Sequence, residues 1–225
     1  MLKTKKQGNL IIISGTTCAG KGTVIKKLLE NHNDIVLSVS YTSREKREHE
    51  IDGVDYYFVT KEEFEEKISK NEFLEYAQVH YGCYYGTPKK EILNQLETGK
   101  DVILEVDVQG AKQIKEKYPE TILIFIMAPS MEEVKRRIKK RGDENNEQII
   151  SRFKVAYNEI NQINNYNYVV VNDDLKESVK KVEAILISEK LRVDRIEELA
   201  MENQEEIIHE FLIDKEFDNS IKEII

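Results

Sequence analysis

Gly15, Gly20 and Lys21 stand at the spacing of a phosphate-binding loop in the stretch ISGTTCAGKGT. In the pattern G-x-x-x-x-G-K-[ST], the loop turns consecutive backbone N–H groups and a helix N-terminus toward one point, which stabilises phosphate charge. The hydroxyl residue expected after the lysine is missing, because Gly22 stands there and Thr23 follows. The stretch therefore predicts a phosphate site in which a bound Mg2+ would rely on phosphate oxygens, waters and nearby carboxylates.

The segments around this loop occur in the order that such a loop requires. The apolar run NLIIIS before it is typical of a buried strand, and TVIKKLLE after Lys21 is typical of a helix. The alternative is an ordinary strand-to-helix turn with a surface lysine, and the neighbouring elements argue against it. Cys18, inside the loop, is either a small packing residue or a thiol activated by the helix N-terminus.

Four further apolar runs resemble the strand before the loop. All are short, rich in Ile and Val, and separated by helical patterns, which is typical of buried parallel strands in an α/β sheet. The five expected strands cover residues 9–14, 34–40, 101–106, 121–127 and 168–171. Helices are expected from about Lys21 and over residues 109–117, 131–140, 147–161 and 175–190.

Residues 41–100 interrupt this alternation of strands and helices. They contain the aromatic, β-prone stretches YYFV and YGCYYGT and two helical stretches, KEEFEEKISK and PKKEILNQLETG. An insertion of this size in an α/β domain is more often a substrate-binding subdomain than a bare loop. We therefore expect a core of residues 1–40 and 91–190, and a subdomain of residues 41–90.

The composition argues against several classes of protein. The chain has 225 residues, 40% of them apolar, which allows one substantial core. Its net charge of −8 argues against nucleic-acid binding, and it contains no apolar run long enough for an export signal or a membrane span. Cys18 and Cys83 are too few for a disulfide framework and lack zinc-ligand spacing with the histidines. We expect a cytoplasmic protein with no membrane partner.

The C-terminal part of the chain, from residue 190 to 225, has a different composition. It holds five Lys or Arg against eleven Asp or Glu, and so carries −6 of the net −8. Its apolar residues recur at spacings of one helical face: Ile196, Leu199, Ala200, Ile207, Phe211 and Leu212. We expect residues 191–225 to form an acidic helical extension of unknown role. It either docks on the core or on a second copy, giving a homo-oligomer, or stays partly disordered.

Several motifs, taken together and in order, resemble those of guanylate kinases over about residues 9–188. They are S-x-T-x-R-x-x-R from Ser40, D-G-x-D-Y-x-F-V from Asp52, E-F-L-E-x-A from Glu72 and Y-Y-G-T from Tyr84. The resemblance implies a P-loop kinase fold with a central parallel sheet, an inserted GMP-binding subdomain and a small lid. It also implies transfer of the γ-phosphate of ATP to GMP with Mg2+. The G-K-G-T variant of the loop is similar to that of adenylate kinases.

The resemblance places the acceptor phosphate at four residues of the insertion: Arg44, Arg47, Tyr56 and Tyr85. Guanidinium groups bind phosphate through paired hydrogen bonds, and tyrosine hydroxyls add neutral donors. On composition alone, the stretch REKREHE would more often be a solvated charged face.

Glu75 is the residue expected to select guanine. Guanine presents N1–H and N2–H2 side by side, so that one carboxylate accepts both, whereas adenine has an acceptor at N1. The alternative for Glu75 is an exposed acid without a function. The family pattern places further residues around the base: Ser40, Gly86, Thr87 and Asp107. Glu105 and Asp107 end a buried strand, where a carboxylate is unfavourable unless it is used, and either could hold a metal through water.

The resemblance assigns the transfer step to cations from several elements. These cations are Lys21 of the phosphate loop, Arg137 and Arg141 of the stretch KRRIKKRGDENNE, and Arg152 further along the chain. A lid over residues 137–155 would close over both nucleotides and exclude water, while the alternative for its arginines is a basic helix surface. The expected ATP-binding residues are those of the loop and one asparagine: Gly15, Thr16, Thr17, Cys18, Ala19, Gly20, Lys21, Gly22, Thr23 and Asn172. For Asn172, in VNDD, the alternative is a helix N-terminal cap.

Two other functions stay open at this point. A kinase acting on another small phosphorylated acceptor would lack base-recognition residues, and Ser40, Glu75 and Thr87 argue against it. A guanylate-kinase-like scaffold module that binds phosphorylated peptides tends to lose the phosphate loop, and Lys21 argues against that.

Overall fold

The computed structural model describes residues 3–4, 8–78, 82–140, 146–192 and 199–200. The chain divides into two compact units, one of residues 7–188 and one of residues 1–6 with 189–225. The first unit contains the predicted phosphate loop and the insertion.

A five-stranded sheet forms the core of the larger unit, with the strand order β10-β9-β2-β8-β3. Its strands are β2 (Leu10–Gly15), β3 (Ile35–Leu37), β8 (Asp101–Glu105), β9 (Ile122–Met127) and β10 (Tyr168–Val171). Every neighbouring pair is parallel, which confirms the predicted sheet. The strands β8 and β9 are each one residue shorter than expected, and β3 is four residues shorter, because the chain leaves this sheet before Tyr41, which pairs with Gly86 in a second sheet.

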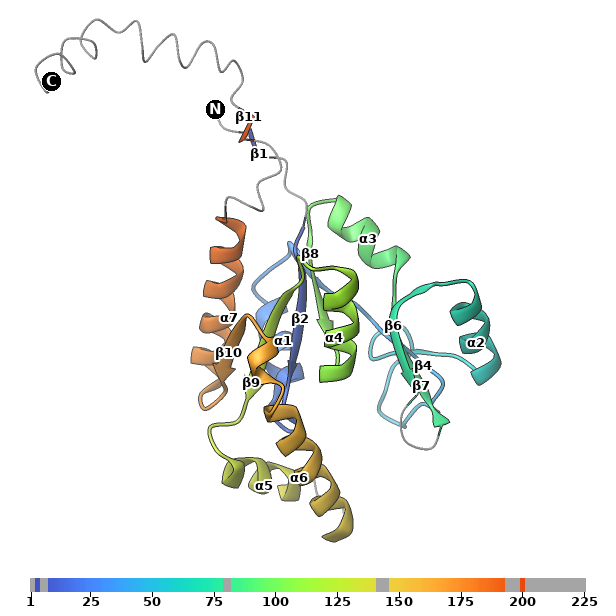
Figure 1. Ribbon diagram of the computed structural model, residues 1–225, viewed down its shortest axis with the longest axis vertical. Coiled ribbons are helices and arrows are strands. Elements are labelled where there is room, and N and C mark those ends of the chain that lie inside the picture. The colour runs from blue at the N-terminus through green and yellow to red at the C-terminus, as the bar shows by residue number, and fades with distance from the viewer. Residues whose placement is uncertain (1–2, 5–7, 79–81, 141–145, 193–198, 201–225) are drawn as a thin grey trace, which may run out of the picture. The chain divides into compact units, whose positions relative to one another are not determined.

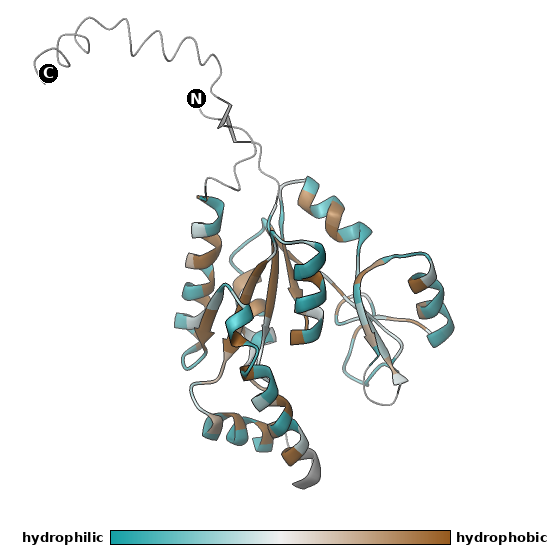
Figure 2. Ribbon diagram, in the orientation of Figure 1, coloured by the Kyte–Doolittle hydropathy of each residue, from teal (hydrophilic) through white to brown (hydrophobic). Residues whose placement is uncertain are grey.

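The strand β2 lies at the centre of the sheet, between β9 and β8. Its residues Ile11, Ile12 and Ile13 are all 0% exposed, since helices cover both faces of the sheet. A parallel strand covered on both sides has no solvent face, which explains its continuous apolar run. Figure 2 shows these strands as the most apolar part of the ribbon.

Six helices belong to this core: α1 (Lys21–Leu29), α3 (Lys90–Glu97), α4 (Val108–Lys117), α5 (Met131–Lys140), α6 (Asn146–Ile160) and α7 (Leu175–Lys190). One face of the sheet packs against α1 and α7, and the other against α3 and α4 (Figure 1). The helices α5 and α6 pack on each other through Val134, Ile138 and Ala156. The predicted helices are confirmed, each to within a residue or two of its predicted ends.

The insertion forms a four-stranded sheet of its own, in the order β5-β4-β7-β6. Its elements are β4 (Tyr41–Thr42), β5 (Tyr57–Phe58), α2 (Lys61–Ser69), β6 (Phe73–Gln78) and β7 (Tyr84–Pro88). Phe64 of α2 is fully buried and stacks on Phe73 at 4.5 Å between ring centroids. Gly86 lets these rings lie against β7, because a Cβ there would come within 2.8 Å of the Phe64 ring. The boundaries 41–90 of a separate subdomain stay a prediction.

The smaller unit has one described pairing, between β1 (Lys3–Thr4) and β11 (Leu199–Ala200), which are antiparallel. The backbone at Leu199 and Ala200 is therefore extended, so the predicted helix does not include these two residues. The rest of the predicted extension falls on residues 193–198 and 201–225, outside the described part of the chain. Among the described helices, none is both long and apolar enough to cross a membrane.

Candidate functional site

The phosphate loop connects the end of β2 at Gly15 to the start of α1 at Lys21. Three of its residues have positive φ: Gly15 at 140°, Cys18 at 59° and Gly20 at 88°. A Cβ on Gly15 would lie 1.8 Å from the carbonyl oxygen of Ile126, so only glycine fits there. The Lys21 ammonium group folds back over the loop and donates to the carbonyls of Gly15 (3.0 Å) and Thr16 (3.2 Å).

Two side chains from the core hold the far end of the loop. Asn172 is buried, and its Nδ2 donates to the carbonyl of Ala19 at 2.7 Å. Arg137 donates to the same carbonyl at 3.1 Å and to the carbonyl of Asn172 at 2.9 Å, while Glu133 pairs with its Nε at 2.6 Å. The alternative role of Asn172 as a helix cap is wrong, because Asp174 accepts the first-turn N–H at the start of α7.

The start of the loop is held by a residue that the sequence did not single out. Glu159, on α6, is 9% exposed, and its Oε2 accepts the N–H of Thr17 at 2.7 Å. Burial raises the pKa of Glu159, while the Thr17 N–H and the charge of Lys21 lower it. The two residues lie 142 positions apart in the chain, so no local pattern could have paired them.

Gly22 faces a carboxylate. A Cβ at this position would lie 3.5 Å from Oε2 of Glu105, which is an ordinary contact distance. Glu105 and Asp107 are both exposed, so the expectation that these carboxylates are buried is wrong. The reason is that β8 ends at Glu105 and the chain turns outward. Asp107 then caps α4, where its Oδ1 accepts the N–H groups of Gln109 (2.9 Å) and Gly110 (2.8 Å).

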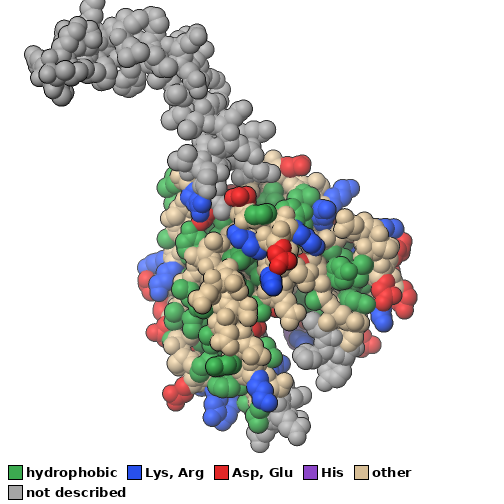
Figure 3. All heavy atoms as spheres, viewed as in Figure 1, with side chains coloured by type: hydrophobic (Ala, Val, Ile, Leu, Met, Phe, Trp, Pro, Cys, Tyr) green, Lys and Arg blue, Asp and Glu red, His purple; other side chains and the backbone are tan. Residues whose placement is uncertain are grey.

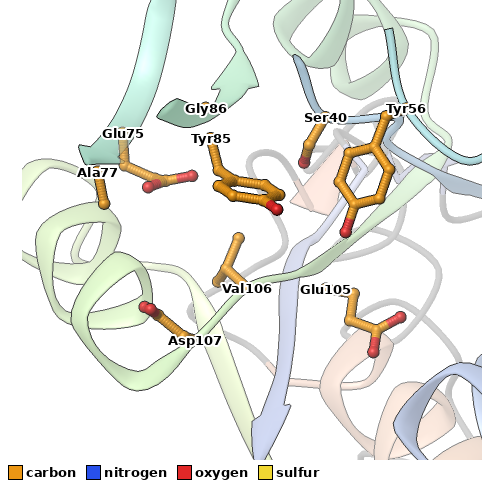
Figure 4. Close-up of a pocket in the computed structure, with 9 residues that line it drawn as sticks. All are labelled: Ser40, Tyr56, Glu75, Ala77, Tyr85, Gly86, Glu105, Val106 and Asp107. Carbon is orange, nitrogen blue, oxygen red and sulfur yellow. The ribbon is translucent and has the colours of Figure 1, made fainter. Parts of the chain in front are cut away.

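A cavity of about 310 Å³ opens between the four-stranded sheet and the end of β8. It is lined by Ser40, Tyr56, Glu75, Ala77, Tyr85, Gly86, Glu105, Val106 and Asp107. In Figure 4 the side chains of Glu75, Tyr85 and Tyr56 come from one side of it, and those of Glu105 and Asp107 from the other. Six of the nine residues predicted to bind the acceptor therefore lie around one cavity, and a seventh, Thr87, contacts Glu75.

Among the described residues that line this cavity, Glu75 is the one buried acid, at 6% exposed. Thr87, the residue that faces it across the β6–β7 pair, donates its hydroxyl to Oε1 at 2.6 Å. Burial raises the pKa of Glu75 to about 7, with a further rise from Asp107, while Thr87 and Lys117 lower it. The alternative reading of Glu75 as an exposed acid is wrong.

Arg44 is held in place by a buried acid, Glu50, that no sequence pattern indicates. Its Nη1 and Nη2 donate to the two carboxylate oxygens of Glu50 at 2.9 and 2.8 Å, and its Nε donates to the hydroxyl of Tyr85 at 3.1 Å. Glu50 is 8% exposed, and its bond to Arg44 lowers its pKa to about 2 despite burial. In the sequence, Glu50 is the last residue of the stretch REKREHE, in which acidic and basic residues are mixed. Nothing in that pattern distinguishes a buried acid from an exposed one.

The other predicted residues lie in different surroundings. The Arg47 side chain is 65% exposed, and its backbone N–H donates to Glu50 at 2.8 Å. Arg152 lies on α6, on the same helix as Glu159. Cys18 is half-buried and packs against the apolar residues between α5 and α6, while Cys83 is also a free thiol. Arg141 lies outside the described residues.

A phosphate loop between a buried parallel strand and a helix, on a sheet covered by helices on both faces, defines the class of P-loop kinases. Residues 7–189 match the family model described as Guanylate kinase, and the chain belongs to the guanylate kinase family. A guanylate kinase from Clostridium tetani (strain Massachusetts / E88) is 56% identical over 209 residues, which are 93% of this chain and 100% of that protein.

Two further relatives agree with this assignment. A guanylate kinase from Clostridium perfringens (strain SM101 / Type A) is 55% identical over 208 residues, covering 92% of this chain and 96% of that one. The crystal structure of guanylate kinase from Anaplasma phagocytophilum superimposes with a TM-score of 0.73 at 36% identity, covering 93% of this chain and 96% of that one.

Proposed function

We propose that this chain transfers the γ-phosphate of ATP to GMP, giving ADP and GDP. The observation that carries this proposal is the buried Glu75 carboxylate in a polar cavity, held by Thr87 at 2.6 Å. An ionised carboxylate in this position accepts two neighbouring N–H donors, and the N1–H and N2–H2 groups of guanine supply them. Adenine lacks this pair of donors, so the buried carboxylate would keep only its bond to Thr87, and a site of this kind rejects the unmatched analogue by about 10^4-fold.

The acceptor phosphate is assigned to the arginine and tyrosine side chains at one end of the cavity. Arg44 is already oriented by Glu50 and by Tyr85, whose ring packs edge to face with Tyr56 at 5.7 Å. A pre-oriented guanidinium loses little side-chain freedom when it binds an anion, which favours affinity. Arg47 is exposed and contributes a second guanidinium group for the phosphate. The base is enclosed by Ser40, Glu75, Gly86, Thr87 and Asp107.

The phosphates of ATP are assigned to the loop of residues 15–23. The first-turn N–H groups of α1, at Lys21, Gly22 and Thr23, have no intrahelical acceptor and are available to an anion. The Lys21 ammonium lies over the loop on two carbonyl groups, from which it can move to the phosphates. Asn172, fixed to Ala19, is assigned to the adenine end.

Charge compensation at the transferred group is assigned to Lys21, Arg137, Arg141 and Arg152. Phosphoryl transfer needs aligned anions and compensated charge more than covalent chemistry by the protein. Arg137 touches the carbonyl of Ala19 in the loop, and Arg152 lies on the neighbouring helix α6. We assign the lid to residues 137–155, which would exclude water when both nucleotides are bound. No side-chain base is needed, because the acceptor phosphate is already an anion.

The donor set around Gly22 fits Mg2+. This ion binds through one or two carboxylates together with substrate phosphates and waters, and the exposed Glu105 carboxylate lies where a side chain at position 22 would point. Asp107 lies two residues further on. The described residues contain no group of three acids, histidines or cysteines that would hold a metal without the nucleotide. When bound, Mg2+ neutralises phosphate charge, and Glu105 and Asp107 would orient its waters.

We place the reaction in the cytoplasm, as part of purine nucleotide metabolism, because both cysteines are free and ATP and GMP are the partners. The net charge of −8 does not favour nucleic acid as a partner. Figure 3 shows basic and acidic side chains interspersed over the described part of the face in view, which also argues against a nucleic-acid surface. Self-association through residues 191–225 stays a prediction.

The test is a coupled assay of ADP release with GMP, AMP, CMP and UMP as acceptors, each at the same concentration. We expect turnover with GMP and at least a thousandfold lower kcat/KM with AMP, in line with about 10^4-fold discrimination. Equal rates with GMP and AMP would contradict the guanine assignment. Hydrolysis of ATP without an acceptor would contradict the transfer.

A further inference from the structure

Glu159 on α6 is a buried carboxylate that the phosphate loop contacts directly. It is 9% exposed, and its Oε2 accepts the backbone N–H of Thr17 at 2.7 Å. Among the described residues, Lys21, Asp107 and Tyr166 also act on it electrostatically. A buried carboxylate is unfavourable unless it forms a specific interaction, and here that interaction is with the loop.

The position of this carboxylate is unfavourable for a second reason. The loop is assigned to bind polyphosphate, and a like charge beside it opposes that binding. Burial and Asp107 raise the pKa of Glu159, while the Thr17 N–H and Lys21 favour its charged form. The contact must therefore contribute something that a neutral packing residue would not.

The Thr17 N–H is the contact that completes the turn. The N–H before it, at Thr16, donates to the carbonyl of Ile126 on β9 at 3.1 Å, and the N–H of Ala19 donates back to Thr16 at 3.0 Å. Cys18 between them has a left-handed φ of 59°, a conformation that non-glycine residues adopt only when the surroundings enforce it. Glu159 supplies the remaining constraint on the turn just before Cys18.

The same carboxylate links the loop to the proposed lid. Arg152 lies seven residues before Glu159 on α6, which is two turns along the same helix face. The neighbouring helix α5 reaches the loop through Arg137, which donates to Ala19 at 3.1 Å. The two helices pack through Val134 and Ala156. The loop is thus hydrogen-bonded to α6 at Thr17 and to α5 at Ala19.

We propose that Glu159 is a positioning residue for the ATP side of the reaction. Its hydrogen bond to the Thr17 N–H sets the phosphate loop and fixes α6, with Arg152, against that loop. Glu159 touches neither nucleotide and acts through the loop. This inference rests on the proposed function, because it assumes that the loop binds ATP.

The first test compares steady-state kinetics of the full chain with the variants E159A, E159Q and N158A. E159A loses the acceptor for Thr17, and we expect its KM for ATP to rise about tenfold while its KM for GMP stays within about twofold. E159Q keeps an acceptor oxygen of the same shape, and we expect its KM for ATP to stay within about threefold of the wild type. Asn158 is an exposed neighbour on the same helix, so N158A should leave both constants unchanged.

Three outcomes would overturn the inference: E159A without any change in KM for ATP, E159A with equal rises in both KM values, or E159Q behaving like E159A. A wild-type chain that transfers no phosphate to GMP would instead contradict the proposed function, so the two failures are distinguishable.

A second measurement needs no destabilising substitution. The amide proton shift of Thr17, followed by NMR from pH 4 to 8, should titrate in the wild type with the Glu159 carboxyl group. In E159Q this titration should be absent, while the shift itself stays close to that of the hydrogen-bonded wild type. A Thr17 amide that titrates identically in both proteins, or in neither, would overturn the inference.

Discussion

The phosphate loop and the acceptor cavity are held in different ways. In the loop, surrounding groups hold the backbone: Ile126 binds the N–H of Thr16, Glu159 binds the N–H of Thr17, and Asn172 binds the carbonyl of Ala19. In and beside the cavity, side chains hold side chains, as Thr87 holds Glu75 and Glu50 holds Arg44.

The two sites should therefore respond differently to pH and to substitution. Backbone N–H groups carry no net charge and keep their direction at any pH, so the loop tolerates change at positions whose side chains it does not use. The acceptor side depends on ionised side chains: the pKa of Glu50, which holds Arg44, is lowered to about 2, and the pKa of Glu75 in the cavity is raised to about 7. We therefore expect the acceptor side to respond to pH and to neutral substitutions, and the loop to respond mainly to its glycines, its lysine and the removal of Glu159.

The largest effect should come from Lys21→Met. This substitution removes the one side-chain cation of the loop and leaves a side chain of similar length. We expect kcat to fall about 10^4-fold, as it does when other cations that compensate the charge of a transferred phosphoryl group are removed. The cavity should be unaffected, and GMP should bind as in the wild type by calorimetric titration. A loss of GMP binding in K21M would show that the phosphate loop and the acceptor cavity do not bind their ligands independently.

Glu50→Gln should act on the acceptor alone. The neutral side chain holds Arg44 less firmly, because charge-assisted bonds are about twice as strong as neutral ones, and we expect KM for GMP to rise about tenfold. KM for ATP should not change. The matched control is Glu48→Gln, which alters an exposed acid of the same segment. A fall in KM for GMP would mean instead that Glu50 competes with the acceptor phosphate for Arg44.

The pH dependence should separate the two ends of the molecule. With the pKa of Glu75 raised to about 7, its protonated form accumulates below pH 7 and accepts fewer donors, so KM for GMP should rise roughly tenfold per pH unit there. KM for ATP should not follow this trend. The phosphate of GMP also titrates near pH 6, and E75Q provides the correction, because it lacks the Glu75 step. Identical profiles for E75Q and wild type would contradict this role.

Glu75 and Glu50 should change the pH dependence of folding stability in opposite directions. The native state holds a proton on Glu75 between the usual pKa of 4.5 and about 7, so without ligand this residue lowers stability as the pH rises through that range. For Glu50, with a pKa lowered to about 2, stability is lost as the pH falls from about 4.5 toward 2. The measurement is the melting temperature as a function of pH. E75Q should lack the loss of stability between pH 4.5 and about 7, and E50Q should lack the loss below about pH 4.5.

The smallest effect should come from Gly22→Ala. A Cβ there meets only the Glu105 carboxylate at 3.5 Å, so we expect kcat and KM for ATP to stay within about threefold. The matched variant is Gly20→Ala, where φ is 88° and a Cβ would lie 2.7 Å from Nδ2 of Asn172. That variant should lose most ATP binding. Equal losses in both would contradict the view that the loop uses only some of its glycines.

The same difference decides how much could be predicted from the sequence. The sheet and the loop were predictable, because a buried parallel strand is apolar at every position and the glycines of the loop stand at fixed spacings. The acceptor residues became visible only through the resemblance to guanylate kinases. From composition alone, Arg44 in REKREHE looks like part of a solvated surface.

The residues that escaped prediction are the partners of functional groups. Glu50 and Glu159 are buried acids whose partners, Arg44 and Thr17, lie six and 142 positions away. Burial of an acid depends on the tertiary structure, and an acidic chain offers many similar glutamates. Asp107 shows the opposite error, because its place at the end of an apolar strand suggested burial, whereas the chain turns outward and the side chain caps α4.

The most direct test is a calorimetric titration of the wild type and E75Q with GMP and with AMP at pH 8, where Glu75 is ionised. We predict that the wild type binds GMP at least about a thousandfold more tightly than AMP, and that E75Q loses most of that preference, because its amide keeps one acceptor and replaces the other with a donor. Equal binding of GMP and AMP by the wild type, or an undiminished preference in E75Q, would contradict the assignment of Glu75 as the residue that recognises guanine.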